Sequence, residues 1–337
     1  MSDETRAAGR RPAKPAWQQE IAPFAQADER KAIWQLANTI VPYFGLWLLM
    51  VYTIKAGIPY WVTLALSIPA AGLLVRIFIF FHDCGHGSFL PSSRANTAVG
   101  YVCGVLTFTP FHDWRIAHAR HHATAGNLDR RGTGDVWTMT VEEYQAASRW
   151  QRLAYRLFRN PLILFGLGPA VSFLILQRFP HKGAKKRERR SVVITNLALL
   201  AIVIIASLTI GLGTYLLVQL PIILVAGVLG LWLFYVQHQY EGVYWARQEA
   251  WDPTRAALEG SSYYRLPRLL RWFTGNIGLH HIHHLRPRIP NYHLQPCYDQ
   301  VPAMQAVQPL TVRQSLNCLR MNLWDERRQE LVSFRAR

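Results

Sequence analysis

Four long apolar stretches, joined in pairs by short links, dominate the pattern of hydrophobic and polar positions along this chain. They occupy residues 34–54, 60–81, 191–210 and 214–236. A helix needs roughly 20 mostly apolar residues to cross a bilayer, and all four stretches reach that length. The links, residues 55–59 and 211–213, are so short that each pair must be antiparallel neighbours. We therefore predict an all-α integral membrane protein with four transmembrane helices in two hairpins.

Two shorter apolar stretches, residues 95–111 and 161–177, have 17 residues each. Their length alone is compatible with a span, a re-entrant segment or an interfacial helix. Four arginines at positions 149 to 159 precede the second stretch, and the basic segment 178–190 follows it. Because Lys and Arg favour the cytoplasmic side of a membrane, basic segments on both flanks predict that this stretch does not cross. We expect both short stretches to form interfacial helices.

The same charge pattern places both termini and all large polar segments in the cytoplasm. Residues 1–30 lack the apolar region of a secretory signal and are expected to form a mobile cytoplasmic arm. Residues 31–305 form the predicted membrane domain, including a cytoplasmic helical cap, and residues 306–337 a cytoplasmic C-terminal segment. Arg76, near the end of the second long stretch, is expected to reach the headgroup layer if the helix runs on past the interface into the cytoplasm.

Composition narrows the class of protein further. Half of the 337 residues are hydrophobic, 17% are charged, and the formal net charge is +17. This is too apolar for a disordered chain, and the 4 cysteines, none in a CxxC pair, are expected to be reduced packing residues. The charge alone would allow a nucleic-acid binder. Because the basic excess flanks uncharged apolar stretches, we instead expect contact with lipid headgroups and no nucleic acid.

Ten of the 13 histidines lie in three clusters and at one further position, all beyond the predicted cytoplasmic ends of spans. The candidate metal ligands are His82 and His86, then His118, His121 and His122, then His238, and finally His280, His283 and His284. Residues three and four apart share one face of a helix, so each cluster is expected to aim its imidazoles at one point. His281 lies off that face. We expect His112, His181 and His293, outside the clusters, to be surface or interfacial side chains.

Several clusters on one side of a membrane carry more weight than any one of them. A single HxxHH pattern arises easily by chance, whereas three clusters with helical spacing do not. One zinc ion needs only four ligands, so eight or nine imidazoles indicate two transition-metal ions. Imidazole suits iron, copper or zinc.

The clusters also carry a family resemblance. HDCGH, HARHH and HHIHH resemble the three histidine boxes of the integral-membrane fatty acid desaturases. The segments NLDRRGTGDVWTMTVEEY, LWLFYVQHQYEGVYW and RWFTGNIGLHHIHHLRPRIPNYHL are similar to bacterial acyl-lipid desaturases of the Δ5 and Δ12 type. The resemblance extends over residues 30–300. It implies a four-span fold with a cytoplasmic cap, a non-haem centre of two iron ions, and O₂-dependent insertion of a double bond into an acyl chain.

The resemblance assigns the eight histidines of the boxes as iron ligands, and His238 matches an extra histidine of some members. Those members place an asparagine one helical turn earlier, where this chain has Phe234. Metal-bound histidines usually donate their second N–H to a carboxylate or carbonyl. The candidates for this supporting role are Asp83, Asp113, Glu241 and Asn276.

The implied reaction needs partners. The sequence shows no dinucleotide-binding GxGxxG loop, no CxxCH haem attachment and no ferredoxin-type cysteine run. Electrons are therefore expected from a separate ferredoxin or flavodoxin with its reductase, drawn to the basic face. The expected substrate is a phospholipid acyl chain in a bacterial cytoplasmic membrane. It is expected to enter a narrow apolar tunnel, whose candidate lining residues are Trp137, Tyr235, Trp245 and Trp272.

The histidine pattern also fits other activities. A hydroxylase, an acetylenase or a carotenoid ketolase uses the same scaffold, while a metal transporter or a bis-histidine haem protein would place its polar ligands inside the spans. The residues leave open the position of the double bond, the chain length and the electron donor. They also leave open whether the acyl group is carried by a lipid, CoA or a carrier protein, and the oligomeric state.

Overall fold

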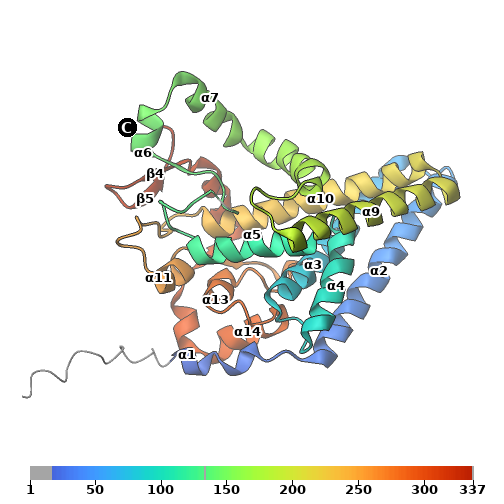
Figure 1. Cartoon of the computed structure of the whole chain (residues 1–337), viewed down its shortest axis with the longest axis horizontal. Coiled ribbons are helices and arrows are strands. Elements are labelled where there is room, and N and C mark those ends of the chain that lie inside the picture. The colour runs from blue at the N-terminus through green and yellow to red at the C-terminus, as the bar shows by residue number, and fades with distance from the viewer. Residues whose placement is uncertain (1–16, 133, 336–337) are drawn as a thin grey trace, which may run out of the picture.

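The computed structural model describes residues 17–132 and 134–335. Four of its helices are long and apolar enough to cross a membrane: α2 (Glu29–Lys55), α3 (Tyr60–His86), α9 (Lys186–Thr209) and α10 (Leu212–His238). Helices α2 and α3 form one antiparallel hairpin, and α9 and α10 form the other (Figure 1). The prediction of an all-α membrane protein with four spanning helices in two hairpins is confirmed.

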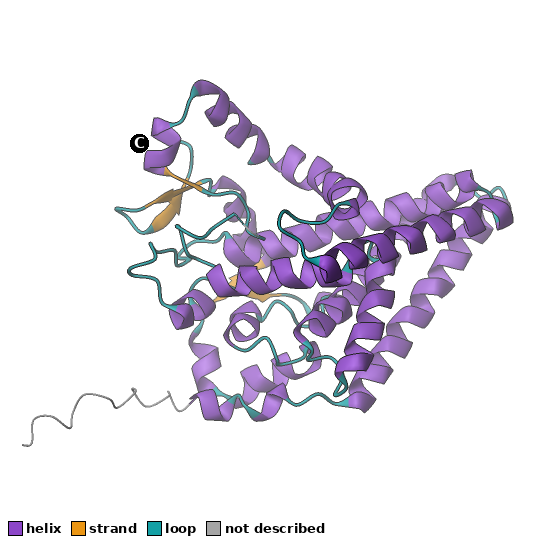
Figure 2. Ribbon diagram, in the orientation of Figure 1, coloured by secondary structure: helices purple, strands orange, loops and turns teal. Residues whose placement is uncertain are grey.

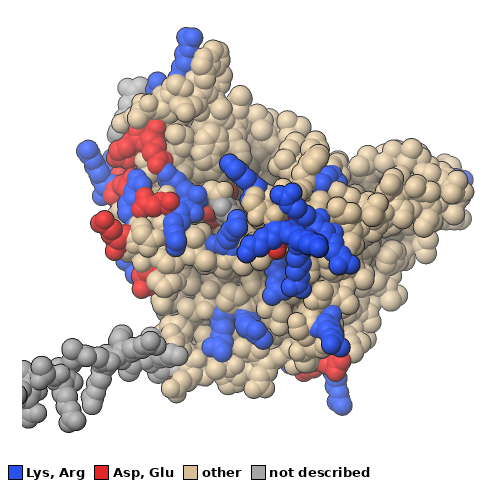
Figure 3. All heavy atoms as spheres, viewed as in Figure 1, with Lys and Arg blue, Asp and Glu red and all other residues tan. Residues whose placement is uncertain are grey.

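Large apolar side chains point outward from these helices. Leu208 on α9 is 82% exposed, and Trp61 on α3 is 69% exposed. Figure 3 shows the far end of the α9–α10 hairpin with almost no charged side chains. A contiguous apolar surface of this kind is unfavourable in water and favourable against lipid tails. The fold is that of a membrane protein.

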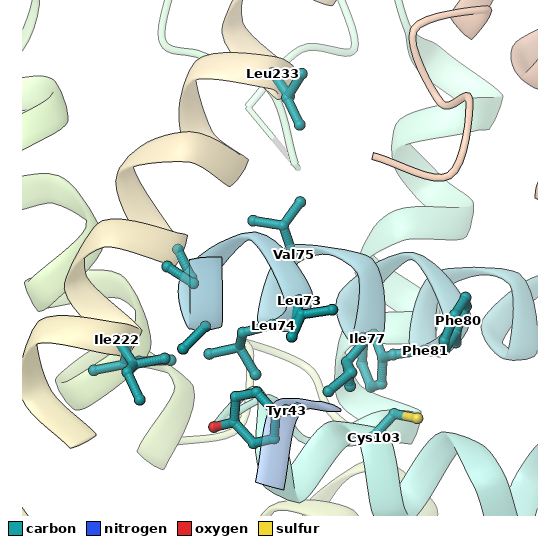
Figure 4. Close-up of a cluster of buried hydrophobic side chains, with 14 of the residues drawn as sticks. Tyr43, Leu73, Leu74, Val75, Ile77, Phe80, Phe81, Cys103, Ile222 and Leu233 are labelled. Carbon is teal, nitrogen blue, oxygen red and sulfur yellow. The ribbon is translucent and has the colours of Figure 1, made fainter. Parts of the chain in front are cut away.

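Helix α3 is the central helix of the bundle and is buried around most of its circumference. It packs against α2, α10 and the shorter helix α4 (Ser93–Leu106). Figure 4 shows Leu74 of α3 beside Tyr43 of α2 in the apolar core. Close approach also depends on Gly72, where a Cβ would lie 2.8 Å from the ring of Phe273.

Arg76 lies inside this bundle, so the expectation that it reaches the headgroups is wrong. Its side chain is buried, and Nε donates to Thr39 Oγ1 at 3.1 Å. A terminal guanidinium nitrogen donates to the backbone oxygen of Trp272, whose ring lies 4.3 Å from the guanidinium carbon. The physical reason is that the segment around Trp272 covers this part of α3 and accepts a hydrogen bond from the guanidinium.

The apolar stretch after α7 (Arg149–Phe158) is bent and irregular. The segment Leu162–Arg178 meets α7 at 61° and consists of π and 3-10 turns around the short α8 (Gly168–Ala170). Pro169 lacks the backbone N–H that a regular helical ladder requires at that position. The 14 residues of α4 extend only about 21 Å, less than the bilayer core. An interfacial position for both segments stays a prediction.

The remaining elements form a cap at one end of the long helices (Figures 1 and 2). Its helices are α5 (Phe111–Thr124), α6 (Val141–Ala146), α11 (Pro253–Leu258), α12 (Arg268–Phe273), α13 (His280–Leu285), α14 (Asn291–Gln300) and α15 (Val312–Ser315), with 3-10 turns Pro302–Ala306 and Leu316–Arg320. All four cysteines are buried and form no disulfide among the described residues.

Short strands, which the sequence pattern did not predict, tie the C-terminal segment to the cap. The strand β1 (Met139–Thr140) pairs in parallel with β4 (Leu323–Asp325), which pairs antiparallel with β5 (Glu330–Val332). A second parallel pair joins β2 (Tyr263–Arg265) to β3 (Pro309–Thr311). Strands of two or three residues carry no readable alternation, so their register depends on tertiary contacts.

Part of the expected N-terminal arm lies outside the described residues, namely residues 1–16. From there the chain folds onto the cap as α1 (Trp17–Glu20) and the 3-10 turn Pro23–Ala25. Ile21 is buried, and the ring nitrogen Nδ1 of His293 on α14 lies 3.0 Å from the backbone oxygen of Phe24.

Candidate metal centre

Four helices deliver the nine candidate histidines to one place. His82 and His86 lie on the last turns of α3, and His238 ends α10. The other six lie on the cap helices, with His118, His121 and His122 on α5 and His280, His283 and His284 on α13. The long helices thus extend beyond the bundle to meet two short helices of the cap.

The nine side chains form two groups, in each of which the candidate ligand atoms lie within 4.8 Å of one another. The five-histidine group contains His82, His86, His118, His122 and His283. The four-histidine group contains His121, His238, His280 and His284. Every histidine expected as a ligand belongs to one of the two groups, and no other histidine does.

The structure corrects the expectation that each cluster aims at a single point. On α5, His118 and His122 belong to the five-histidine group, whereas His121 belongs to the four-histidine group. On α13, His283 belongs to the five-histidine group, whereas His280 and His284 belong to the four-histidine group. The side chains of residues i and i+4 point in directions that differ by about 40° around the helix axis, and those of adjacent residues differ by about 100°. The i, i+4 pair therefore serves one group, and the i+3 residue turns toward the other.

Hydrogen bonds at Nδ1 of two histidines leave their Nε2 atoms facing each other with free lone pairs, an arrangement that a bound cation would stabilise. The Nδ1 of His238 donates to the Gly260 carbonyl at 3.2 Å, and that of His121 lies 2.8 Å from an Asp135 carboxylate oxygen. With the protons on Nδ1, both Nε2 atoms carry lone pairs, yet they lie 3.1 Å apart. Ligands at right angles around an ion with bonds of about 2.1 Å would be about 3.0 Å apart. The side chains present therefore fit a bound metal.

The five-histidine group has the same spacing. The Nε2 atoms of His118 and His122 are 3.1 Å apart, and those of His122 and His283 are 3.0 Å apart. Burial lowers the pKa of all three histidines well below the ordinary value, and neighbouring imidazoles lower it further. The same holds for the pKa of His280 and His284. Neutral imidazole, the form that binds metal, is therefore the stable form at neutral pH.

Only one of the four candidate supporting residues contacts these groups. Asp83 Oδ1 lies 3.0 Å from Nδ1 of His82, while its Oδ2 accepts from the backbone N–H and the side-chain amide of Asn291 at 2.7 and 2.9 Å. Asp113 instead lies 2.7 Å from Nδ1 of His181. The carboxylate of Asp83 thus orients one histidine and joins α3 to the start of α14.

The other two candidates lie away from the histidines. Glu241 is exposed and lines a separate cavity of about 560 Å³ on the cap. Asn276 is half-buried, and its amide lies 3.5 Å from the backbone oxygen of Asn291. Neither has a hydrogen bond to a histidine of the two groups among the described residues.

Sequence reasoning missed Asp135 and Gly260, which orient His121 and His238. Both lie in irregular segments with no helical or strand periodicity, so spacing could not connect them to the histidines. Gly134 offers the one local signal, because its φ of +76° favours glycine and a Cβ there would lie 3.0 Å from His121 Cβ. This glycine lets the loop bring Asp135 against α5.

Phe234, where some desaturases have an asparagine, is a direct neighbour of the four-histidine group. Its ring centroid lies 5.3 Å from that of His121 and 5.2 Å from that of His238. The group therefore has an apolar ring where an amide would have offered a polar contact.

The remaining four histidines have other partners. Arg187 Nε donates to His112 Nε2 at 3.1 Å, and His181 binds Asp113. His281 is fully buried, lies 3.0 Å from the Met304 oxygen, and has its pKa lowered by burial to about 4. With His293 on α14, these side chains lie outside both groups.

An apolar cavity of about 370 Å³ leads away from the histidines between α3, α10 and the bent segment. Its aromatic lining is Phe78, Trp114, Phe173 and Phe234. None of the four expected lining residues, Trp137, Tyr235, Trp245 and Trp272, is part of it. Those four side chains contact other parts of the protein: Tyr235, for example, donates to the Cys318 carbonyl at 3.0 Å.

Comparison with known proteins decides the family. The family model described as "Fatty acid desaturase" matches residues 56–315, which include all nine histidines of the two groups. The chain belongs to the fatty acid desaturase family. It is 49% identical over 317 residues to the "Fatty acid desaturase" of Bacillus subtilis (strain 168), covering 94% of this chain and 90% of that protein.

More distant desaturases also match. The "sn-1 oleoyl-lipid 12-desaturase" of Synechocystis sp. is 28% identical over 238 residues, covering 66% of this chain and 63% of that protein. The endoplasmic reticulum omega-3 desaturase of Vigna radiata is 30% identical over 250 residues, covering 67% and 61%. This desaturase is therefore a membrane-embedded oxidoreductase, in contact with lipid acyl chains, and the transporter and haem interpretations are set aside.

Proposed function

We propose that this desaturase inserts a double bond into phospholipid acyl chains at two iron ions held by the nine histidines. The observation that carries the proposal is the pair of neutral imidazole groups at the inner end of an apolar cavity. An unactivated methylene has no acidic proton and no polarised bond, so acid–base catalysis alone cannot oxidise it. A metal pair that reduces O₂ supplies the oxidising power for removing two hydrogens.

The donor set supports iron. Nine imidazoles without a carboxylate among them would leave the charge of the metal uncompensated, which would keep the site oxidising, and imidazole binds iron readily. A structural zinc site is typically closed by four ligands, whereas one group here offers five. The five-histidine group would hold one ion and the four-histidine group the other.

The residues of the chain have three roles in this proposal. Asp83 and Asp135 accept from Nδ1 of His82 and His121 and so direct the opposite ring nitrogens toward the metals. Trp114 stacks on His118 with ring centroids 4.3 Å apart and fixes the wall between cavity and histidines. The apolar walls bind the chain and exclude water from the reacting carbons.

The electron donor in this proposal is a small acidic ferredoxin or flavodoxin. Support comes from α5, where Arg115 and Arg120 are exposed and have no side-chain partner among the described residues. Figure 3 shows Lys and Arg gathered near α5 and the start of α9. On this helix, Arg120 lies on the side away from the histidines, whereas Arg115 lies one turn before His118. Reduction by ferredoxin should slow as ionic strength rises, and an insensitive rate would count against this docking.

We place the enzyme in a bacterial inner membrane with the cap and both termini in the cytoplasm. The basic segment Lys182–Arg190 supports this orientation. A single cysteine introduced at position 185 should react with a membrane-impermeant reagent only after the cells are opened. Labelling of intact cells would reverse the orientation.

The test of the reaction is expression in a host that makes only saturated lipids. Acyl chains that lose two mass units indicate desaturation, and a gain of sixteen indicates a hydroxylase. Purified protein should contain two irons per chain, and His121→Ala or His284→Ala should abolish the product. Full activity in both variants would defeat the proposal.

A further inference from the structure

The cavity beside the histidines has a polar half and an apolar half. Gln237, one residue before His238, lines the half next to the metal groups. Thr107, the residue after α4, lines the cavity as well, and the last turn of α4 approaches Phe81, the residue before His82, at Gly104. Gln177 also lines the cavity, and the next residue, Arg178, donates to the carbonyl of Phe108, the residue after Thr107.

The opposite half is mostly apolar, although Ser172, three residues after Pro169, also lines the cavity. There the walls are Leu74 of α3, Ile223 and Ala226 of α10, and Pro169 of the bent segment. An acyl ester has one polar end and one methyl end, so the polarity of the walls gives the chain a direction. The ester belongs near Thr107 and Gln177, and the methyl tail lies against Ile223.

Gly230 lies halfway along this passage. It is seven residues after Ile223 and seven before Gln237, which is about 10 Å from each along the helix axis. A Cβ at Gly230 would meet nothing within 4 Å, although the residue lines the cavity. The other two glycines of the lining differ, because a Cβ at Gly227 or Gly134 would contact Pro169 or His121.

We propose that Gly230 sets the length of acyl tail that this desaturase accepts beyond the oxidised carbon. The inference rests on the proposed reaction and adds its chain-length determinant. Without a side chain at this position, the tail passes along α10 to the floor at Ile223. A bulky residue would remove the deep half of the passage, about 10 Å or roughly eight methylenes of an extended chain.

The test compares Gly230→Ala, Gly230→Leu and Gly213→Leu in the host with saturated lipids. Gly213 is the matched control, because it lies on the same helix, a Cβ there also meets nothing, and it does not line the cavity. For Gly230→Leu, the ratio of 18-carbon to 14-carbon products should fall at least tenfold, with a smaller fall for Gly230→Ala. The double bond, counted from the ester, should keep its position, because the polar half is unchanged.

Two results would overturn the proposal. A wild-type product ratio in Gly230→Leu would mean that the tail does not pass this residue. Loss of all products in Gly230→Leu, with unchanged melting temperature and iron content, would mean that the chain enters from the deep end.

A binding measurement separates the inference from the reaction itself. The probe is phosphatidylglycerol whose 16-carbon chain carries a diazirine near the methyl end, incorporated into vesicles with the purified protein. Illumination should attach the probe near Ile223 in the wild type and shift the attachment toward Phe234 in Gly230→Leu. If the probe attached at the same residues in both proteins, the role of Gly230 would be refuted even if the enzyme were active. If the wild type were inactive but the probe attached as expected, only the proposed desaturation would be refuted.

Discussion

The two histidine groups differ in how they are built, although the same helices supply both. The five-histidine group has more candidate ligands, of which one, His82, is held from behind by Asp83, while Nδ1 of His122 and of His283 is buried without a hydrogen-bond partner among the described residues. The four-histidine group has fewer candidate ligands, and two of them are held from behind, His121 by Asp135 and His238 by the Gly260 carbonyl, although Nδ1 of His280 is also buried without a partner among the described residues. Ligand number and ligand orientation are thus alternative ways to secure a metal, and each group relies more on one.

Removing one ligand should separate the groups most strongly. In His121→Ala, three histidines remain in the four-histidine group, so we expect loss of that metal and a product yield at least a thousandfold lower. In His122→Ala, four remain in the other group, so the metal content should fall less although activity is also lost. Metal analysis of purified protein measures the difference, with His112→Ala as a control outside both groups. Equal metal loss in the two variants would contradict the proposed difference between the two groups.

Acidification should destabilise the metal-free protein through both groups. Burial lowers the pKa of His118, His122, His280, His283 and His284 in the folded state. Below about pH 6.5 the unfolded chain binds protons that the folded chain does not, so stability falls as pH decreases. Each such histidine contributes about 1.4 kcal/mol per pH unit in that range. The melting temperature of the metal-free protein, measured from pH 8 to pH 5, tests this expectation. A flat profile would contradict the buried neutral state, and bound metal should shift the loss to lower pH.

Removing the carboxylate behind a ligand should have a smaller effect than removing the ligand. Asp135→Asn should weaken metal binding roughly 10- to 100-fold at the four-histidine group while leaving the melting temperature of the metal-free protein nearly unchanged. Asp83→Asn should weaken binding and also lower that melting temperature, because Asp83 anchors Asn291 as well. Metal titration and thermal unfolding of both variants test this contrast. A melting temperature unaffected by Asp83→Asn would show that the link to α14 is dispensable.

The smallest effect is expected at the glycine that shapes the Asp135 loop. Gly134→Ala should cost about 1 to 2 kcal/mol, because alanine is strained at positive φ and its Cβ would press on His121. Gly132→Ala has the same backbone strain, with φ of +101°, but its Cβ meets nothing. The first variant should therefore lose metal affinity at the four-histidine group, and the second should lose only stability. Equal affinities would remove the role assigned to the loop.

Much of this arrangement could be predicted from the sequence because it depends on local periodicity. The apolar stretches gave the four spanning helices, and helical spacing gave the nine histidines of the centre. Helical spacing explains why the i+3 histidine turns away from the i, i+4 pair, but which histidines of α5 and α13 share a group depends on how the two helices pack against each other. Asp135 and Gly260 were missed because loops carry no period. Arg76 was misplaced because hydropathy does not reveal that the cap covers the end of α3.

The parallel pairing of β1 with β4 has a consequence for how the protein is made. Met139 pairs with Leu323, so the strand that precedes α6 must wait for a partner synthesised after all four membrane helices have left the ribosome. His280, His283 and His284 also emerge after those helices. The membrane hairpins can therefore insert during translation, whereas the cap closes, and the histidines converge, only afterwards. Metal loading is then a late event in biogenesis, open to competition from whichever ion is present when the cap closes.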